Sequence, residues 1–462
     1  LTGWVLYASM GVDAADFWAQ YDHMYIPELG HNVSVTDYAH TLYIRASWTD
    51  FNPQEDVYGW KIDSNLRAYI EGAYQRNMRL AFRVVVDSRD KRTEFTPQFV
   101  KDAGAKGFMN KGKWSPYSDD PVFQKYYTKF VKALAKDFND PSKVEFIDGF
   151  GLGKWGEYHT MIYSTGDDTP KKAVFDWVTD IYSQAFDKVP VVINYHRWIG
   201  AGKDWVDDEH FAADSEEMLE EAIKKGYSLR HDAFGMTTYY GSWERRFAEK
   251  YRNICPIIME GGWIVKSHNY WQDPRGYRKD SHEDVRRGEF DDSKEAHVNM
   301  MDFRFGDTES WFKDAFDLVR RFLREGGYRL YPSEISLPLE VSKKTTPTIK
   351  HCWNNLGWGY CPTNIPQWNQ KYKVAFALLD SETNEVRYTF VDTDTDLSKW
   401  IKGSPAEYVF EPDMSKAETG TYVWAVGLVD RSNKDLVGLD IAAKGDILDS
   451  GWLKLSKVSI NK

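Results

Sequence analysis

Two glutamates have surroundings that suit acid–base chemistry. Glu157 lies in the glycine-rich, aromatic segment 151–159, and Glu260 follows the apolar run 257–259 and precedes two glycines. A carboxyl group at the end of an apolar strand loses part of its hydration, which raises its pKa. Two such groups facing each other across a ligand can divide the work, because one donates a proton while the other, ionised, acts as a nucleophile. The alternative for either residue alone is a salt-bridged glutamate at the rim of the fold.

Eight short apolar runs supply the strands that would position these glutamates. They are rich in β-branched residues and alternate with amphipathic sequence, which is typical of buried parallel strands joined by helices. Eight such repeats within about 330 residues favour an α/β fold of the (β/α)8 TIM-barrel type over an open doubly wound sheet. No GxGxxG motif follows the first run, so a dinucleotide fold has no support. The expected strands are 3–7, 41–46, 79–86, 144–151, 191–195, 232–238, 256–260 and 298–303.

The two glutamates follow the fourth and the seventh of these strands. In a (β/α)8 barrel the catalytic groups lie at the carboxyl ends of the strands, where the eight strand-to-helix loops converge. Glu157 and Glu260 are therefore expected at the same mouth, on nearly opposite sides of the barrel. For the pair, the functional interpretation is favoured over two unrelated salt bridges.

The pattern changes after about residue 331. Short alternating runs and turn residues replace the helical spacing, and about seven strands follow in some 130 residues, which is typical of an immunoglobulin-like β-sandwich. We therefore predict two domains, a barrel over residues 1–331 and a C-terminal sandwich over residues 332–462. The expected strands of the sandwich are 335–339, 348–352, 372–379, 386–391, 408–410, 421–429 and 453–458.

The composition excludes some functions and favours one ligand class. Among the 462 residues, 59 Lys and Arg stand against 70 Asp and Glu, a net charge of -11, which argues against nucleic-acid binding. No run approaches the roughly 20 apolar residues that span a bilayer. Aromatic residues make up 16% of the chain, and their flat apolar faces suit sugar rings. The alternative use of these aromatic side chains is to fill a large barrel and its helix layer.

The three cysteines have no spacing that suits a metal site. Cys255 precedes an expected strand and is predicted to be buried. Cys352 and Cys361 are nine positions apart, so either a loop-closing disulfide or two free thiols fits the sequence.

The strand-end segments resemble a known group of enzymes. Segments 45–60, 155–157 and 258–262 are similar to those of the clan of retaining (β/α)8 glycoside hydrolases, and the resemblance covers residues 1 to about 330. It implies that Glu157, after strand four, is the acid/base and that Glu260, after strand seven, is the nucleophile. Gly156 departs from the pattern, because the clan commonly has an asparagine there that contacts the sugar 2-hydroxyl. The C-terminal part also looks like a β-sandwich that is often attached to such barrels.

Further residues at the strand ends are candidates for positioning the reacting groups. The resemblance places Arg45 beside Glu260, where a hydrogen bond would keep the nucleophile ionised; the alternative is a salt bridge beneath the rim. Tyr239 and Tyr240, after strand six, either steady Glu260 through a phenol hydrogen bond or pack beneath the loop. His159 is two residues beyond Glu157, where it would tune that acid or contact the sugar.

Other strand-end side chains are candidates for binding a sugar directly. Asn194 and His196 follow strand five and would bind hydroxyl groups at the mouth, although a lone histidine is more often structural. Tryptophans in the strand-end loops would stack on sugar rings. The long charged loop 263–289 is either a solvated lid or a cleft wall, and its arginines leave open a substrate with carboxylate or sulfate groups. The candidate tryptophans are Trp48, Trp155, Trp198 and Trp263.

The expected activity is hydrolysis of β-glycosidic bonds in a polysaccharide or oligosaccharide by double displacement. Carboxylates perform both the proton transfer and the attack, so this chemistry needs no metal or other cofactor. Two alternatives remain open, a carbohydrate-binding protein on an idle barrel and an inverting glycosidase or lyase. The C-terminal domain either extends the scaffold or binds glycan. A glycan substrate also predicts export to the periplasm or cell surface of a bacterium.

Overall fold

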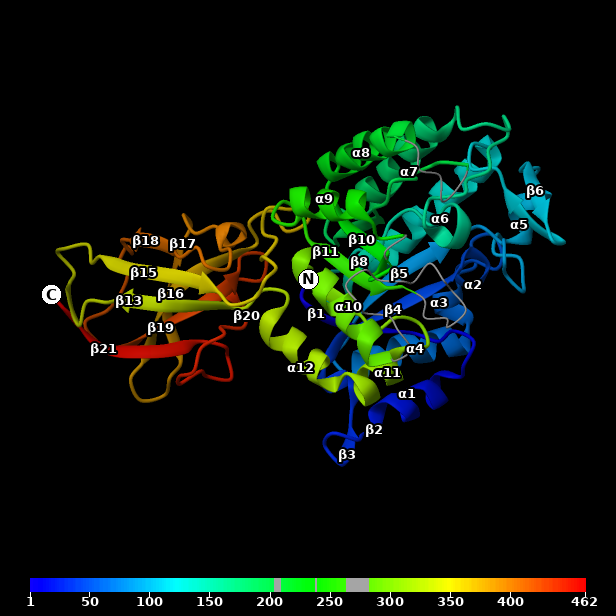
Figure 1. Ribbon diagram of the computed structural model, residues 1–462. Helices are drawn as coiled ribbons and strands as arrows, with labels where there is room; N and C mark the ends of the chain where they lie inside the picture. Colours follow the sequence, from blue (N-terminus) through cyan, green and yellow to red (C-terminus); the bar gives the residue numbers. More distant parts are fainter. Residues whose placement is uncertain (203–208, 237–238, 263–281) are drawn as a thin grey trace. The chain divides into compact units, whose positions relative to one another are not determined.

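The computed structural model describes residues 1–202, 209–236, 239–262 and 282–462 (Figure 1). The chain splits into two compact units, Leu1–Leu323 and Arg324–Lys462. Trp263, predicted to stack on a sugar, and the end of the strand expected at 232–238 lie outside the described residues.

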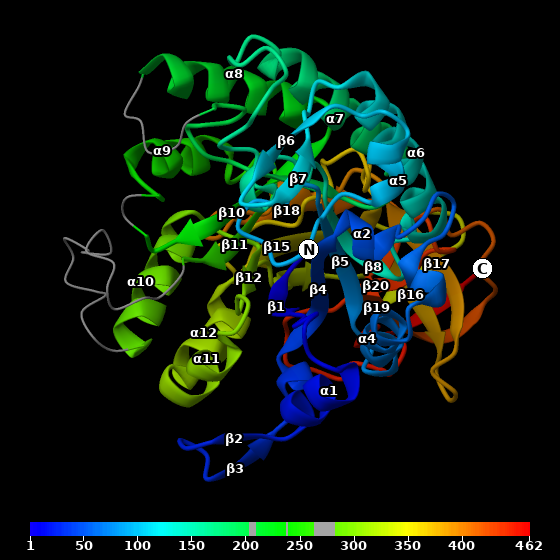
Figure 2. The ribbon, with the colours of Figure 1, turned by 90° about the vertical axis from the view of Figure 1, so that its right-hand side faces the viewer.

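The first unit is built on a closed barrel of eight parallel strands (Figures 1 and 2). Neighbouring strands are hydrogen-bonded in parallel throughout, and β12 pairs with β1 to close the barrel. The predicted (β/α)8 barrel is therefore confirmed. The eight strands are β1 (Gly3–Tyr7), β4 (Ala39–Ser47), β5 (Arg79–Val85), β8 (Val144–Asp148), β9 (Val191–Asn194), β10 (Tyr227–Phe234), β11 (Ile257–Gly261) and β12 (Met300–Asp302).

The sixth barrel strand begins earlier than predicted. β10 starts at Tyr227, whereas the sequence indicated a start at Asp232. The prediction was wrong because Arg230, His231 and Asp232 interrupt the apolar pattern. Arg230 and His231 are fully inaccessible to solvent and only 3% of the Asp232 side chain is exposed, so here charge does not indicate exposure.

Helices form the outer layer of the barrel. In α6 (Pro121–Phe138) the carboxylate of Asp120 caps the first turn, proline occupies the first position, and one apolar face is buried. The other main helices are α1 (Ala14–Asp22), α4 (Ser64–Gln75), α7 (Lys171–Ala185), α8 (Glu209–Lys224), α9 (Ser242–Tyr251), α10 (His282–Glu295), α11 (Thr308–Asp314) and α12 (Phe316–Glu325). Short helices are α2 (Trp48–Phe51), α3 (Gly59–Ile62) and α5 (Gln98–Asp102), with one-turn 3-10 helices η1 (Val35–Asp37) and η2 (Lys154–Gly156).

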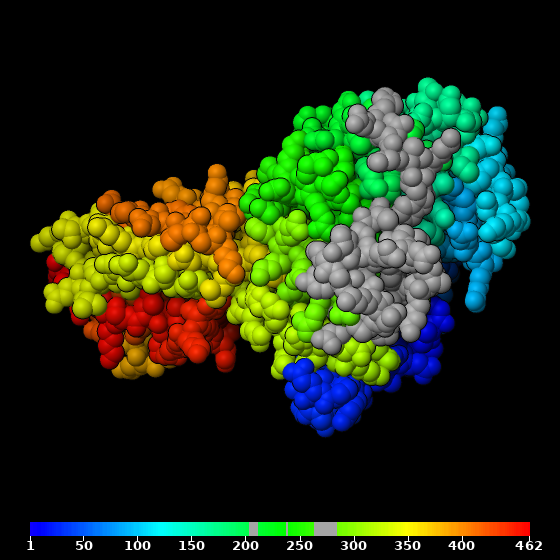
Figure 3. All heavy atoms as spheres, in the orientation of Figure 1, coloured from blue at the N-terminus to red at the C-terminus, as the bar shows by residue number. Residues whose placement is uncertain are grey.

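Two hairpins extend from the first unit. One is formed by β2 (Met24–Ile26) and β3 (His31–Val33), and the other by β6 (Gly107–Asn110) and β7 (Lys113–Pro116). In the space-filling view they are the dark-blue and light-blue protrusions (Figure 3).

The second unit contains a three-stranded and a six-stranded sheet. The first has the order β13 (Leu330–Ser336), β15 (Ile349–Asn355), β18 (Ala406–Phe410). The second has the order β14 (Glu340–Ser342), β21 (Leu453–Asn461), β19 (Gly420–Asp430), β16 (Tyr372–Asp380), β17 (Val386–Asp392), and β20 (Leu436–Leu439) pairs with β19. A one-turn 3-10 helix, η4 (Leu397–Lys399), precedes β18. The two strands missing from the prediction, β14 and β20, have three and four residues, too few to show alternation.

Side chains link the two sheets of this unit. Trp353 donates its indole N–H to His351 Nδ1, so His351 donates from Nε2 to Asp392, 2.9 Å away on the other sheet. Phe376 stacks on Phe410 across the same gap. The arrangement is consistent with the predicted β-sandwich, while an immunoglobulin-like strand order stays a prediction.

None of the three cysteines forms a disulfide. Cys352 and Cys361 are free thiols, so the disulfide alternative is not realised, and Cys255 is buried as predicted. Within the described ranges, no helix combines the length and the hydropathy needed to cross a bilayer.

Candidate active site

A cavity of about 500 Å³ lies at the carboxyl ends of the barrel strands. Both predicted catalytic residues, Glu157 and Glu260, line it, and they come from the fourth and seventh strands as expected. Trp155 lines it from the same loop as Glu157. The other lining residues lie at the ends of five further strands or just after them, and they are Tyr7, Ala8, Met10, Gly11, Arg45, Ala46, Ser47, Asp50, Val85, Lys91, Phe95, Asp232, Ala233, Met236, Tyr239, Arg304 and Phe305.

A tightly coiled loop carries Glu157 from β8 into the cavity. Six of the ten residues from 151 to 160 have a positive φ, and two of them are Trp155 at 59° and Tyr158 at 61°. A side chain at Gly151 would put Cβ 1.9 Å from the carbonyl oxygen of Val84, so only glycine fits there. A left-handed conformation at tryptophan costs of order 1 kcal/mol, and such strain is concentrated at functional sites.

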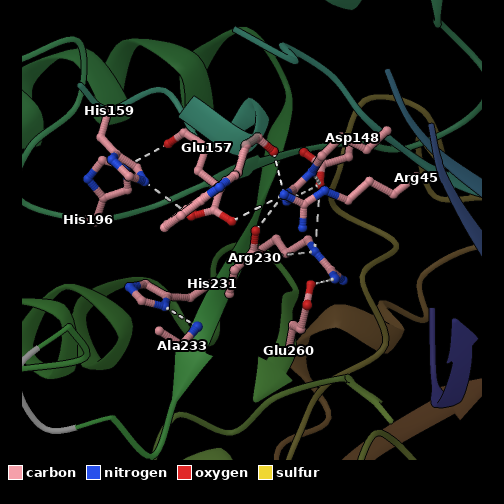
Figure 4. A network of polar contacts seen from close by, with 12 residues as sticks. Arg45, Asp148, Glu157, His159, His196, Arg230, His231, Ala233 and Glu260 are labelled. Carbon is pink, nitrogen blue, oxygen red and sulfur yellow. Dashed lines mark hydrogen bonds and ion pairs between the residues drawn. The ribbon is translucent and has the colours of Figure 1, made fainter. Parts of the chain in front are cut away.

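Four side chains from different parts of the barrel contact the Glu157 carboxylate, and one of them is Arg83, whose guanidinium lies 3.8 Å from Oε1. Figure 4 shows Glu157 with His159 and Arg45. The Oε2 atom of Glu157 lies 3.2 Å from His159 Nε2 and accepts a hydrogen bond from the Tyr239 hydroxyl at 3.4 Å. Its Oε1 atom lies 3.5 Å from the Arg45 guanidinium. The Tyr239 hydroxyl is also 2.6 Å from His159 Nε2, so Glu157, His159 and Tyr239 form one connected group.

His196 holds the backbone of Glu157. The backbone N–H of Trp198 donates to His196 Nδ1 at 3.1 Å, so Nε2 carries the proton and donates to the carbonyl oxygen of Glu157 at 2.7 Å. His196 is completely buried and does not line the cavity. The prediction that it binds sugar hydroxyls was wrong, because its ring is engaged with the main chain on both nitrogens.

Glu260 ends β11 and pairs with an arginine of the neighbouring strand (Figure 4). Arg230 Nη2 on β10 lies 2.6 Å from Glu260 Oε2, and both side chains are almost completely buried. Arg304 approaches Oε1 at 4.0 Å. Burial, followed by the charge of Asp232, raises the pKa of Glu260 to about 8, while Arg230 opposes that rise.

Arg45 is not the partner of Glu260 that the resemblance implied. Its guanidinium donates to the carbonyl oxygen of Trp155 at 2.6 Å and to the Tyr7 hydroxyl at 3.3 Å, and it pairs with Glu157. The guanidinium of Arg45 reaches the loop that carries Glu157. Arg230 is closer to Glu260 because it lies on β10, which is hydrogen-bonded to β11.

An ionic network fills the barrel beneath the cavity. Arg83 donates to Asp148 at 2.6 Å and to Asp232 at 2.5 Å, and Arg230 donates to Asp232 at 3.1 Å and to Asp302 at 3.2 Å. The side chains of all five residues are at most 3% exposed. Barrel interiors are more often filled with branched apolar side chains, so this polar filling is specific to the chain.

The network with both glutamates contains one more carboxyl group than it has cations. Five acids meet four arginines, leaving one excess negative charge if every group is ionised. Burial raises the pKa of Asp302 to about 6, whereas Arg83 and Arg230 hold the pKa of Asp232 well below its usual range. Burial raises the pKa of Asp148 as well, so Asp148, Glu260 and Asp302 all hold a proton more strongly than an ordinary carboxyl group does. The acids are Asp148, Glu157, Asp232, Glu260 and Asp302, and the arginines are Arg45, Arg83, Arg230 and Arg304.

Arg83, Arg230 and Arg304 contact the two glutamates but were not predicted from the sequence. The available signal was a charged residue inside an apolar strand, as in Arg83 between Phe82 and Val84. A buried strand accepts such a residue only when a partner charge from another strand neutralises it. That signal marks a polar barrel interior but does not identify the partner.

No family model matches the sequence, and no curated protein matches it. Among solved structures, the chain is similar to an endo-β-1,4-mannanase from Thermotoga petrophila, with 13% identity over 100% of this chain and 97% of that one and a TM-score of 0.42. It is similar to an endo-glycoceramidase II from Rhodococcus sp., with 13% identity, 89% and 96% coverage and a TM-score of 0.42. An exo-β-1,4-mannosidase from Opitutaceae bacterium strain TAV5 shows 12% identity over 66% of this chain and 52% of that one, with a TM-score of 0.37. The chain spans about half the length of the mannosidase.

Two of the three described candidate tryptophans are away from the cavity. Trp155 lines it, and the Lys154 ammonium lies 4.3 Å from the centre of its ring. Trp48 begins α2, is fully buried and packs on the rings of α6, so the prediction that it stacks on sugar was wrong. Trp198 is 1% exposed and packs on Tyr239.

Asn194 and Tyr240 are also corrected by the structure. Asn194 is fully buried, in register with Arg230 inside the barrel, and neither side-chain polar atom has a hydrogen-bond partner among the described residues. Tyr240 accepts a hydrogen bond from the Tyr195 hydroxyl at 3.2 Å and is 1% exposed, so it packs beneath the loop. Tyr239 does reach the site, but it contacts Glu157 rather than Glu260.

Proposed function

We propose that this protein is a glycoside hydrolase that cleaves β-glycosidic bonds in an oligosaccharide or polysaccharide with retention of configuration. The observation that carries the proposal is that Glu157 and Glu260, from the fourth and seventh barrel strands, line one cavity. Trp155 in the same wall offers an apolar ring of the kind on which sugars stack.

In the first step Glu157 gives its proton to the glycosidic oxygen while Glu260 attacks the anomeric carbon. The bond from that carbon to the leaving oxygen breaks, the leaving group departs as an alcohol, and a covalent glycosyl ester forms on Glu260. In the second step Glu157 takes a proton from water, and the water oxygen displaces Glu260 from the anomeric carbon. Two inversions give net retention.

The surrounding residues favour ionisation of Glu260 and fix the orientation of Glu157. Arg230 pairs with Glu260 and favours the ionised form that attacks. His159 and Tyr239 hold the Glu157 carboxyl group, and His196 holds its backbone, which keeps the acid aimed into the cavity. A fixed orientation of the acid raises the rate because the reacting atoms are already held in the geometry of the reaction.

Hydrolysis of a panel of aryl β-glycosides and β-linked polysaccharides tests the proposal. We expect Glu157→Gln and Glu260→Gln each to lower kcat by about 10²- to 10⁴-fold or more. The matched control is Glu55→Gln, because Glu55 pairs with Lys129 on the surface and should leave kcat unchanged. Glycan binding by the parent without hydrolysis of any substrate would instead indicate a carbohydrate-binding protein.

The stereochemistry is tested separately. Proton NMR of the first-formed product should show the anomeric configuration of the substrate. Retention requires carboxyl groups about 5 to 5.5 Å apart, whereas inversion requires about 6.5 to 9.5 Å to admit a water molecule. Azide should restore turnover to the Glu157→Gln enzyme with a β-glycosyl azide as product, and to the Glu260 variant with an α-glycosyl azide. Inverted product from the parent would exclude the double displacement.

A further inference from the structure

Lys91 lines the same cavity as the two glutamates but has no carboxylate partner. It follows β5, its side chain is half-buried, and its ammonium lies 5.4 Å from the centre of the Phe95 ring. Among the described residues, no acid forms an ion pair with it. Phe95 lines the cavity as well, so the apolar stem of Lys91 is covered while its charge faces the ligand space.

The other charges near Lys91 are already compensated. Arg45 pairs with Glu157, and Arg304, the remaining cation of the lining, lies 3.1 Å from Asp307. Asp90, the neighbour of Lys91 in the sequence, pairs instead with Lys154 at 3.2 Å and with Lys111 at 3.8 Å.

Lys91 is therefore an uncompensated cation in a partly desolvated wall. Burial and then the positive charge of Arg45 lower the pKa of Lys91 to about 8, the direction expected for an ammonium that lacks a counter-ion. At neutral pH the amine is still mostly protonated. An anion placed beside it would relieve the desolvation cost and gain a charge-assisted hydrogen bond.

We propose that Lys91 binds an anionic substituent, a carboxylate or a sulfate ester, on a sugar unit of the glycan substrate. This inference rests on the proposed function and narrows its substrate class to acidic β-linked glycans. The acidic unit occupies the part of the cavity beside Lys91 and Phe95, which both line it. Asp232 and Glu260 repel an anion from the deeper part, so the charges also orient the glycan.

Binding of matched neutral and acidic oligosaccharides tests the proposal. The pairs differ only at C6: cello-oligosaccharides against β-1,4-glucuronan oligosaccharides, and manno-oligosaccharides against β-1,4-mannuronan oligosaccharides. Cello-oligosaccharides with 6-O-sulfate distinguish a sulfate ester from a carboxylate as the preferred anion. Calorimetry uses the full chain with Glu260→Gln, so that nothing is hydrolysed and the surroundings of Lys91 are unchanged.

We expect at least one acidic ligand to bind more tightly than its neutral twin. Lys91→Gln should lower the affinity for that acidic ligand by about tenfold or more. It should change the affinity for the matched neutral ligand by no more than about twofold. Lys91→Arg should retain the preference, and raising the salt concentration should reduce it. The control is Lys111→Gln, since Lys111 is 82% exposed on the hairpin loop and outside the cavity lining.

The outcomes separate this inference from the proposed function. Equal affinity for both members of every pair, an unchanged preference in Lys91→Gln, or no binding of any acidic ligand overturns the role of Lys91. Hydrolysis of a neutral glycan by the parent would then still support the glycosidase. Conversely, a preference for acidic ligands that Lys91→Gln abolishes, without hydrolysis of any substrate, supports the anion site and contradicts the glycosidase.

Discussion

The guanidinium of Arg230 lies 2.6 Å from the carboxylate of Glu260, on adjacent strands of the barrel. The same guanidinium lies 3.1 Å from Asp232 and 3.2 Å from Asp302. It also lies 3.6 Å from Asp148, so one buried cation contacts four acids, and the protonation of Glu260 is tied to that of its neighbours.

Removal of Arg230 should destabilise the fold and impair the nucleophile. Arg230→Met leaves buried carboxylates without their shared cation, a change that typically costs about 3 to 5 kcal/mol. Urea unfolding measures the loss. Arg230→Lys retains a charge and should fold, but a single ammonium cannot contact four acids with the same geometry, so kcat should fall. Unchanged kcat in Arg230→Lys would contradict the role of the guanidinium.

Asp302→Asn should move the acid limb of the pH profile to lower pH. The charge of Asp302 helps to raise the pKa of Glu260, and its removal also leaves Arg230 more available to Glu260. The nucleophile then ionises at lower pH, and the acid limb of kcat/KM should shift in that direction. An acid limb that stays in place would show that the two acids do not share a proton.

Glu260 should make the folded state less stable as the pH rises. Its pKa is raised to about 8 from the ordinary 4.5, so between these values the native state holds a proton that the unfolded state has released. The free energy of unfolding should then fall by at most about 1.4 kcal/mol per pH unit between pH 4.5 and 8. Denaturant titrations of the parent and of Glu260→Gln isolate this contribution, which should be missing from the variant.

Tyr239→Phe should lower kcat by about tenfold with little effect on stability. The hydroxyl contacts both His159 and Glu157, while the ring packs against Trp198, and the variant keeps that packing. A hydrogen bond is worth about 1 to 1.5 kcal/mol, which corresponds to roughly tenfold in rate. If the basic limb of the pH profile does not move, Tyr239 acts on something other than the acid Glu157.

Gly151→Ala should be far more destabilising than Gly166→Ala. Both glycines have a positive φ, at 71° and 76°, so both substitutions add backbone strain of about 1 kcal/mol. Only at Gly151 would the new methyl group collide with a carbonyl oxygen, since nothing lies within 4 Å of the position at Gly166. Thermal unfolding of the two variants compares them, and activity should fall only in Gly151→Ala because its loop carries Glu157.

The periodicity of apolar residues was sufficient to predict the barrel and the two strand ends that carry the glutamates. A parallel strand buried on both faces must be apolar along its length, and it needs a helix to return the chain, so eight repeats identify the architecture. The order of the strands in a barrel follows the order of the chain, which places Glu157 and Glu260 at one mouth. The two sheets of the second unit, antiparallel except where β14 pairs with β21, were predicted from alternation, except for the shortest strands.

The partners of each carboxylate were decided only by the tertiary structure. Arg45, Tyr239 and His196 all converge on Glu157, and Arg230 on Glu260, through contacts between residues far apart in the chain. The direction of a side chain after a strand depends on the turn that follows, which is why Trp155 enters the cavity while Trp48 faces a helix. Apolar burial depends on local pattern and can be predicted from the sequence, whereas ion pairing depends on distances of a few ångströms that only the closed barrel sets.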